Sequence, residues 1–151
     1  MAPSTYVAAE QQLSENAQRA LTADTDDLAS HYSGVVESDA APAMKQAALM
    51  LSLADDHIQD GDGEEGAQRA MEALTLFKQE GDKAGEQDSL RLLHSAYRQQ
   101  GKVDFAMEQA QSELAKFKSA GDKRGEASMK LAVGEVQLAQ HLHAEALKSI
   151  E

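Results

Sequence analysis

Cysteine is absent from the 151 residues, and the sequence is poor in proline and in aromatic side chains. The lack of cysteine excludes disulfides, thiolate metal sites and cysteine nucleophiles. Two prolines, both at or before residue 42, leave the rest of the chain free to form long helices. With three Phe, three Tyr and no Trp, Ala and Leu must supply most of the core, which favours closely packed helices.

Long apolar runs and early basic residues are missing as well. The longest strictly apolar run is "AALML" at 47–51, far too short to span a bilayer. The first basic residue is Arg19, so neither a secretory signal nor an Arg-rich transit peptide is visible. We therefore expect no membrane span and an intracellular, cytoplasmic location, or an organelle if a leader has been removed.

Basic charge is scarce and unevenly placed, and the net charge is −12. Residues 1–66 hold two basic and 13 acidic residues, whereas residues 67–151 hold 12 basic and 13 acidic ones. The acidic part is either a solvated face or an electrostatic docking surface for a basic partner. Nucleic acid is not expected as a partner, because phosphates require a basic patch.

One stretch of the sequence occurs twice. "LTLFKQEGDKAGE" at 74–86 returns as "LAKFKSAGDKRGE" at 114–126, an offset of 40 residues with eight of thirteen positions identical. Gly81 and Gly121 suit the left-handed residue that ends a helix, and Asp82 and Asp122 can cap the helix that follows. The repeated stretch therefore predicts a turn between helical hairpins. A phosphate-binding loop is the alternative, but the Gly-Lys-Ser/Thr ending is lacking.

The 40-residue period predicts an all-α array of helical hairpins. We place three hairpins at 42–80, 82–120 and 122–151, with turns at Gly61, at Gly101 and near residue 141. The third is truncated, because its second helix would run past Glu151, so we expect either more sequence or a partner at this end. Residues 1–41 are interpreted as N-terminal helices, at 9–23 and 26–38, that form a degenerate capping half-repeat.

No stretch carries a convincing chemical site. "DGDGEEG" at 60–66 resembles the start of a calcium loop, but the sixth position is Glu65 instead of Gly and the twelfth is Met71 instead of Glu. The histidines of "HLH" at 141–143 are two residues apart, whereas a metal pair on one helix face needs three or four. We find no catalytic motif. The sequence thus predicts no enzyme activity, no cofactor and no metal.

The second hairpin carries Leu90, Leu93, Tyr97 and Ala106 in a pattern that resembles the tetratricopeptide repeat (TPR) family, in particular its branch with 40-residue repeats. The resemblance covers about residues 42–151. It implies a right-handed superhelical solenoid that binds protein partners as an adaptor, within a multiprotein assembly. Two alternatives stay open: a permanent structural subunit of a large complex, and a regulatory domain of a larger enzyme.

The resemblance also implies which residues face a partner, because in this family the first helix of each hairpin lines the groove. Arg91 and Arg98 are seven residues apart and lie on one helix face. They are expected either to clamp a partner carboxylate or to pair with nearby acids such as Asp88 or Glu135. The implied groove residues are Leu51, Asp55, Ile58, Asp88, Arg91, Ser95, Arg98, Leu131, Glu135 and Leu138.

Overall fold

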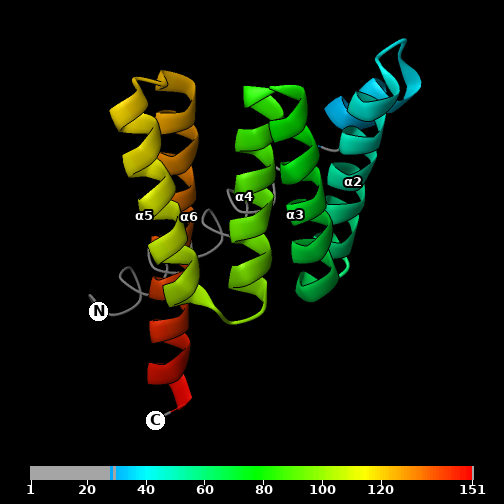
Figure 1. Ribbon diagram of the computed structural model, residues 1–151. Helices are drawn as coiled ribbons and strands as arrows, with labels where there is room; N and C mark the ends of the chain where they lie inside the picture. Colours follow the sequence, from blue (N-terminus) through cyan, green and yellow to red (C-terminus); the bar gives the residue numbers. More distant parts are fainter. Residues whose placement is uncertain (1–27, 29, 151) are drawn as a thin grey trace, which may run out of the picture.

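The computed structural model describes residues 28 and 30–150, and this part of the chain is all-α (Figure 1). Residues 30–37 are helical and precede five longer helices. These are α2 (Pro42–Gln59), α3 (Gly63–Glu80), α4 (Lys83–Gln99), α5 (Val103–Ala120) and α6 (Lys123–Ile150). The first four lie within the ranges expected for the first two hairpins. The helix expected at 9–23 lies outside the described residues.

The turns are made by the glycines that the sequence indicated. Gly81 and Gly121 both have φ of 70°, so each ends its helix in the left-handed conformation. Gly61 and Gly101 also have positive φ and lie in the turns inside the two hairpins. The carboxylate of Asp82 accepts a hydrogen bond from the Gly85 N–H at 3.0 Å. This confirms the predicted function of the duplicated stretch as a turn and cap.

A second pair of glycines lets neighbouring hairpins pack tightly. A Cβ atom added at Gly85 would lie 2.2 Å from the ring of Phe77, and one at Gly125 would lie 2.4 Å from the ring of Phe117. The phenylalanine near the end of one hairpin therefore rests directly on the backbone of the next helix. Any larger residue at either glycine would force the ring or the helix to move.

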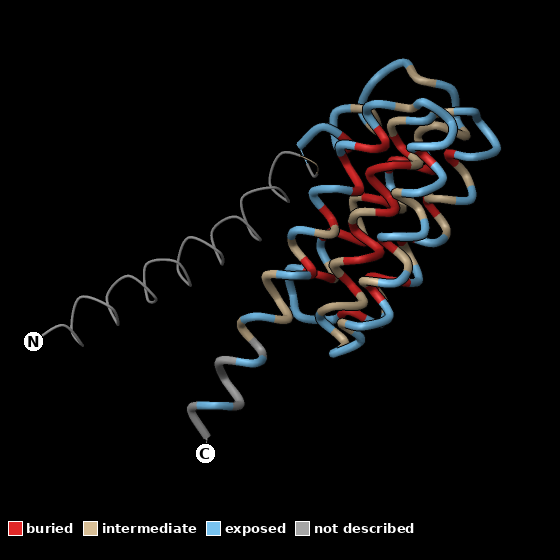
Figure 2. Tube along the Cα trace, turned by 90° about the vertical axis from the view of Figure 1, so that its left-hand side faces the viewer, coloured by how far each residue is buried: buried red, intermediate tan, exposed pale blue. Residues whose placement is uncertain are grey.

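Two clusters of buried side chains hold the helices together. The first joins residues 30–37 with α2, α3 and α4, and includes Tyr32, Leu51 and Phe77. The second joins α4, α5 and α6, and includes Leu90 and Met129. In Figure 1, α4 lies beside α3 and α5 lies beside α6. The buried residues form a continuous band through the helices in Figure 2.

The third hairpin is not formed, which corrects the prediction for residues 122–151. Helix α6 runs without a break for 28 residues, from Lys123 to Ile150. The expected turn fails because position 141, which corresponds to Gly61 and Gly101, is a histidine. A residue with a side chain resists the positive φ used at those turns, and the flanking Leu and Ala residues favour continued helix.

Candidate functional site

The groove residues expected on α2 are not accessible. Leu51, Asp55 and Ile58 are all buried. The physical reason is that α3 and α4 both pack against α2 and cover the face that carries them. The prediction that these three residues contact a partner is therefore wrong.

The arginines expected to clamp a partner already bind a carboxylate of the same chain. Arg91 on α4 donates to Glu135 Oε1 on α6 at 2.7 Å, and Arg98 lies 3.5 Å from Glu135 Oε2. Arg98 also donates to the backbone oxygen of Glu135 at 3.3 Å and to Ser95 Oγ at 2.5 Å. Burial lowers the pKa of the Arg98 guanidinium, and the Glu135 carboxylate opposes that shift. Of the two readings left open, the pairing with Glu135 is the one the structure contains.

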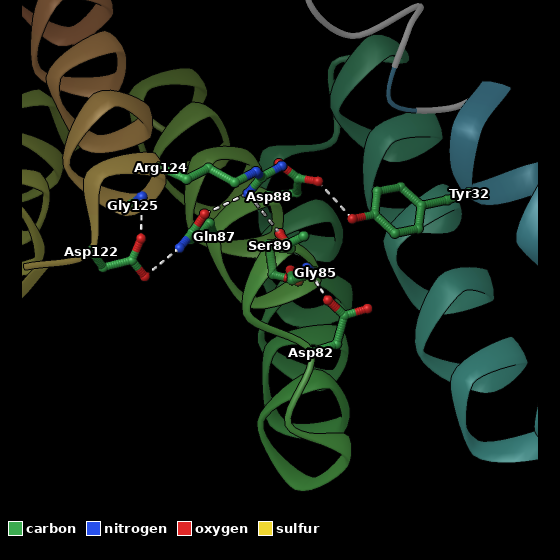
Figure 3. A network of polar contacts seen from close by, with 10 residues as sticks. Tyr32, Asp82, Gly85, Gln87, Asp88, Ser89, Asp122, Arg124 and Gly125 are labelled. Atoms are coloured by element: carbon green, nitrogen blue, oxygen red, sulfur yellow. Dashed lines mark hydrogen bonds and ion pairs between the residues drawn. The ribbon is translucent and has the colours of Figure 1, made fainter.

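Asp88 belongs to a polar network at the amino-terminal ends of α4 and α6 (Figure 3). Its carboxylate accepts a hydrogen bond from the Tyr32 hydroxyl at 2.6 Å and lies 3.5 Å from the Arg124 guanidinium. Burial, followed by the hydrogen bond to Asp88, raises the pKa of Tyr32, so the phenol stays a donor. The groove position predicted at Asp88 is thus occupied by the chain's own tyrosine.

The same network ties α4 to the cap of α6. Gln87 accepts a hydrogen bond from Arg124 and donates to Asp122 Oδ2 at 2.9 Å. The other oxygen of Asp122 accepts from the Gly125 N–H at 2.9 Å, so one carboxylate caps α6 and also binds α4 (Figure 3). These groups are satisfied by each other. The arrangement joins α4 to α6.

One histidine is buried without a polar partner. His94 is 2% exposed, and neither of its ring nitrogens has a hydrogen-bond partner among the described residues. Burial lowers its pKa to about 4, so the ring is neutral at pH 7. The ring therefore lies in the core as an uncharged side chain.

The residues available to a partner lie elsewhere, on an exposed surface that we call the α3–α5 patch. It is defined by Met71 on α3, Tyr97 on α4 and Phe105 on α5. Met71 is 52% exposed and Phe105 is 44% exposed, although both side chains are large and apolar. The rings of Tyr97 and Phe105 meet edge to face with centroids 4.9 Å apart. Two exposed apolar side chains, on α3 and α5, thus lie on either side of the half-buried Tyr97.

A hollow beside these side chains widens the patch. Its volume is about 520 Å³, and it lies between α3 and the turn from α4 to α5. The lining residues are Glu64, Ala67, Gln68, Met71, Glu72, Thr75, Tyr97, Gln100 and Lys102. The surface that lines the hollow is mainly apolar, and it also includes the carboxylates of Glu64 and Glu72.

Sequence reasoning missed this patch, although a signal was present. At the 40-residue offset, Phe105 corresponds to Glu65 and Met71 corresponds to Gln111. A large apolar side chain at a position that is polar in the other hairpin is not required by the core. The remaining predicted groove residues, Leu131 and Leu138 on α6, do not lie on this patch and stay predictions.

Other kinds of site find no support in the described part of the chain. No cluster of three or more His, Asp or Glu side chains there could hold a metal ion. Among the same residues, no helix is both long and apolar enough to cross a bilayer. Comparison with known proteins gave no matching family model, no similar curated protein and no similar solved structure. A functional proposal therefore has to come from the geometry of the surface.

Proposed function

We propose that this chain is a non-catalytic protein-interaction scaffold, a short right-handed solenoid of TPR-like hairpins that binds a segment of a partner protein. The observation that carries the proposal is the α3–α5 patch. Met71 and Phe105 are exposed, and the half-buried Tyr97, which contacts Phe105, lines the same hollow as Met71. Aromatic residues and methionine are the types enriched at the centres of protein interfaces, and contiguous exposed apolar surface marks such sites.

The charge beside the patch indicates the chemistry of the partner. Glu64 and Glu72 line the hollow, and Glu64 follows directly on the turn that carries Asp60 and Asp62. Lys102 is the one basic residue among the lining residues. A short amphipathic segment would fit, with apolar side chains on Met71 and Phe105 and lysines or arginines toward the acidic turn.

The concave groove implied by the TPR resemblance is the weaker candidate. Arg91 and Arg98 are already paired with Glu135, and the α2 positions are buried. A partner acid would have to displace Glu135 and leave its carboxylate without those contacts. The α3–α5 patch requires no such exchange, because its apolar atoms already face solvent.

Selection of peptides on the immobilised chain tests the proposal. We expect selected peptides to combine lysine or arginine with a large apolar anchor, and to bind more weakly as salt is raised. The double variant Met71→Ala with Phe105→Ala should weaken binding at least tenfold, roughly 1.4 kcal/mol. Leu49→Ala, which shortens an exposed leucine on α2, is the matched control and should bind as the wild type does.

Equal binding of the selected peptides to wild type and double variant would show that this surface is not the site. Loss of binding in the Leu49→Ala control would point to the opposite end of the array. Circular dichroism on each variant separates loss of contact from loss of fold.

A further inference from the structure

A single buried side chain anchors the short helix of residues 30–37, which we call the strap. Tyr32 is 3% exposed, whereas the other residues of the strap are exposed or half-buried. Val35 and Val36 add half-buried contacts to the first core cluster. A Cβ atom added at Gly34 would lie more than 4 Å from every atom of α2–α6, so that side of the strap faces open space. Tyr32 is therefore the main anchor of the strap.

The site that holds Tyr32 has the groups that recognise a phenol. The ring lies against Phe77 of α3, with the two centroids 5.6 Å apart. The hydroxyl reaches across to α4 and donates to Asp88 Oδ2 at 2.6 Å (Figure 3). Asp88 is 8% exposed, so a ring without a hydroxyl would leave a buried carboxylate oxygen without that donor. The site therefore favours tyrosine over phenylalanine.

The charges around the site favour a neutral hydroxyl over a phosphate. Burial raises the pKa of Tyr32 most, and the hydrogen bond and charge of Asp88, followed by the charge of Asp82, raise it further. The Arg124 guanidinium opposes this shift by a smaller amount. Because the two carboxylates outweigh the arginine, a phosphorylated tyrosine would be repelled.

The contacts on both sides of the site allow the strap to lift. Asp88 Oδ1 lies 3.5 Å from the Arg124 guanidinium, and the Arg124 side chain is 56% exposed, so the arginine can move toward the carboxylate when the phenol leaves. Ser38 donates its N–H and its hydroxyl to the Val35 oxygen, at 3.2 and 2.7 Å. These bonds close the end of the strap and move with it. Residues 38–41, which connect the strap to α2, then act as the hinge.

We propose that the strap is an internal competitor, and that the site of Tyr32 binds a tyrosine from a segment of a partner protein when the strap lifts. The chain's own tyrosine indicates the ligand, an unmodified phenol carried on a short helical segment. An element with few buried side chains opens at a smaller free energy than the core does. The apparent affinity for the partner is reduced by the fraction of molecules in which the strap is lifted.

A fluorescent peptide that copies residues 28–37 tests the proposal on the full chain. We expect the Tyr32→Ala variant to bind the peptide at least tenfold more tightly than wild type, because the competitor has lost its anchor. Tyr32→Phe, which loses only the hydroxyl, should lie between the two. Wild type should still bind the peptide. A wild type that binds none, or a folded Tyr32→Ala variant that binds none, would overturn the proposal.

Two altered peptides test the chemistry of the ligand. Replacement of the peptide's tyrosine by phenylalanine or by phosphotyrosine should weaken binding to the Tyr32→Ala variant at least tenfold. Asp88→Leu, added to that variant, should remove the preference for tyrosine over phenylalanine. Tighter binding of the phosphotyrosine peptide would show that Arg124 determines the ligand and would contradict the proposal.

Amide hydrogen exchange in the wild type gives a test that requires no variant. We expect the amides of the strap to exchange at least tenfold faster than those in the middle of α3 and α4. Unlabelled peptide added in excess to isotope-labelled protein should speed exchange in the strap further, because it holds the site while the strap is lifted. Equal rates in the strap and in the core would mean that the strap leaves only on global unfolding, which would overturn the proposal.

This site shares no residue with the α3–α5 patch. The double variant Met71→Ala with Phe105→Ala should therefore bind the copied peptide as wild type does. The two proposals can fail separately, because each predicts a loss of binding from changes that leave the other site intact.

Discussion

At the scale of single residues, the duplicated "GDK" stretch determines where one helix ends and the next begins. Gly121 ends α5 with φ of 70°, and its N–H lies 3.2 Å from the Lys118 oxygen. Asp122 then caps α6 and binds Gln87 on α4. Two adjacent residues thus end one helix, start another and attach a third.

Gly121→Val should destabilise the protein by roughly 1–2 kcal/mol, because a branched side chain is strained in the left-handed region. Gly121→Asn is the matched control and should lose less, since asparagine tolerates that region better. Urea unfolding followed by circular dichroism measures both. Equal stability of the valine variant and the wild type would contradict the turn assignment.

His94 gives the core a dependence on pH. Its folded pKa of about 4 lies below the ordinary value of 6.5 because burial disfavours the charged ring. Between these two values the unfolded chain binds the proton and the folded chain does not. The contribution of the neutral ring to stability is therefore complete above pH 6.5 and is lost as the pH falls toward 4.

We expect wild type to lose about 2 kcal/mol more than a His94→Leu variant between pH 7 and pH 5. Leucine fills much of the space and cannot be protonated. The measurement is urea unfolding at the two pH values, with the exposed His31→Ala variant as control. A His94→Leu variant with the same pH dependence as wild type would show that carboxylates alone are responsible.

At the scale of the helices, the start of α5 differs from the start of α3. Asp62 caps α3 by accepting a hydrogen bond from the Glu65 N–H at 3.1 Å. The corresponding residue before α5 is Lys102, whose ammonium group cannot accept a hydrogen bond. The backbone angles are similar at the two sites, with φ of −97° at Asp62 and −87° at Lys102. The geometry for a cap is present at Lys102, and a suitable side chain is not.

Lys102→Asp should therefore stabilise the protein by about 1 kcal/mol, since an aspartate there can cap α5 and its charge suits the helix amino terminus. Asp62→Lys is the reverse change and should cost a similar amount. Thermal melts of both variants and of wild type would measure the effect. A destabilised Lys102→Asp variant would mean that Lys102 contributes to the α3–α5 patch in a way the cap cannot offset.

At the scale of the whole molecule, an ion triad of Arg91, Arg98 and Glu135 joins α4 to α6. Arg91 and Arg98 on α4 both reach Glu135 on α6, across more than 35 residues of sequence. The three side chains are between 10% and 17% exposed, so water screens them weakly. Removal of the Glu135 charge would leave two like-charged guanidinium groups close together in a partly buried place.

Glu135→Gln should cost roughly 3 kcal/mol, near the lower end of the range for breaking a buried ion pair. The exposed pair of Lys116 and Glu113 is the control, and Lys116→Gln should cost less than about 1 kcal/mol. Urea unfolding compares the two variants. If both variants lost less than about 1 kcal/mol of unfolding free energy, the triad would contribute no more than a surface ion pair does.

Local sequence determined the helices and their turns, because those features depend on residues a few positions apart. The turn glycines, the capping aspartates and the apolar spacing of 89–117 predicted the bounds of four helices closely. The sequence also has histidine instead of glycine at position 141. The continuation of α6 through that position could have been predicted from this difference.

Tertiary structure alone decided which side chains are available. Leu51 and Leu131 have the same residue type and the same place in the repeat, yet one is buried and the other exposed, because burial depends on which helix packs alongside. The pairing of Arg91 and Arg98 with Glu135 also depends on contacts between helices. The same is true of the ring contact between Tyr97 and Phe105 and of the hollow that Met71 and Tyr97 line together. Periodicity places a residue on a helix face, and only the packing of the helices determines whether that face meets core, another charge or solvent.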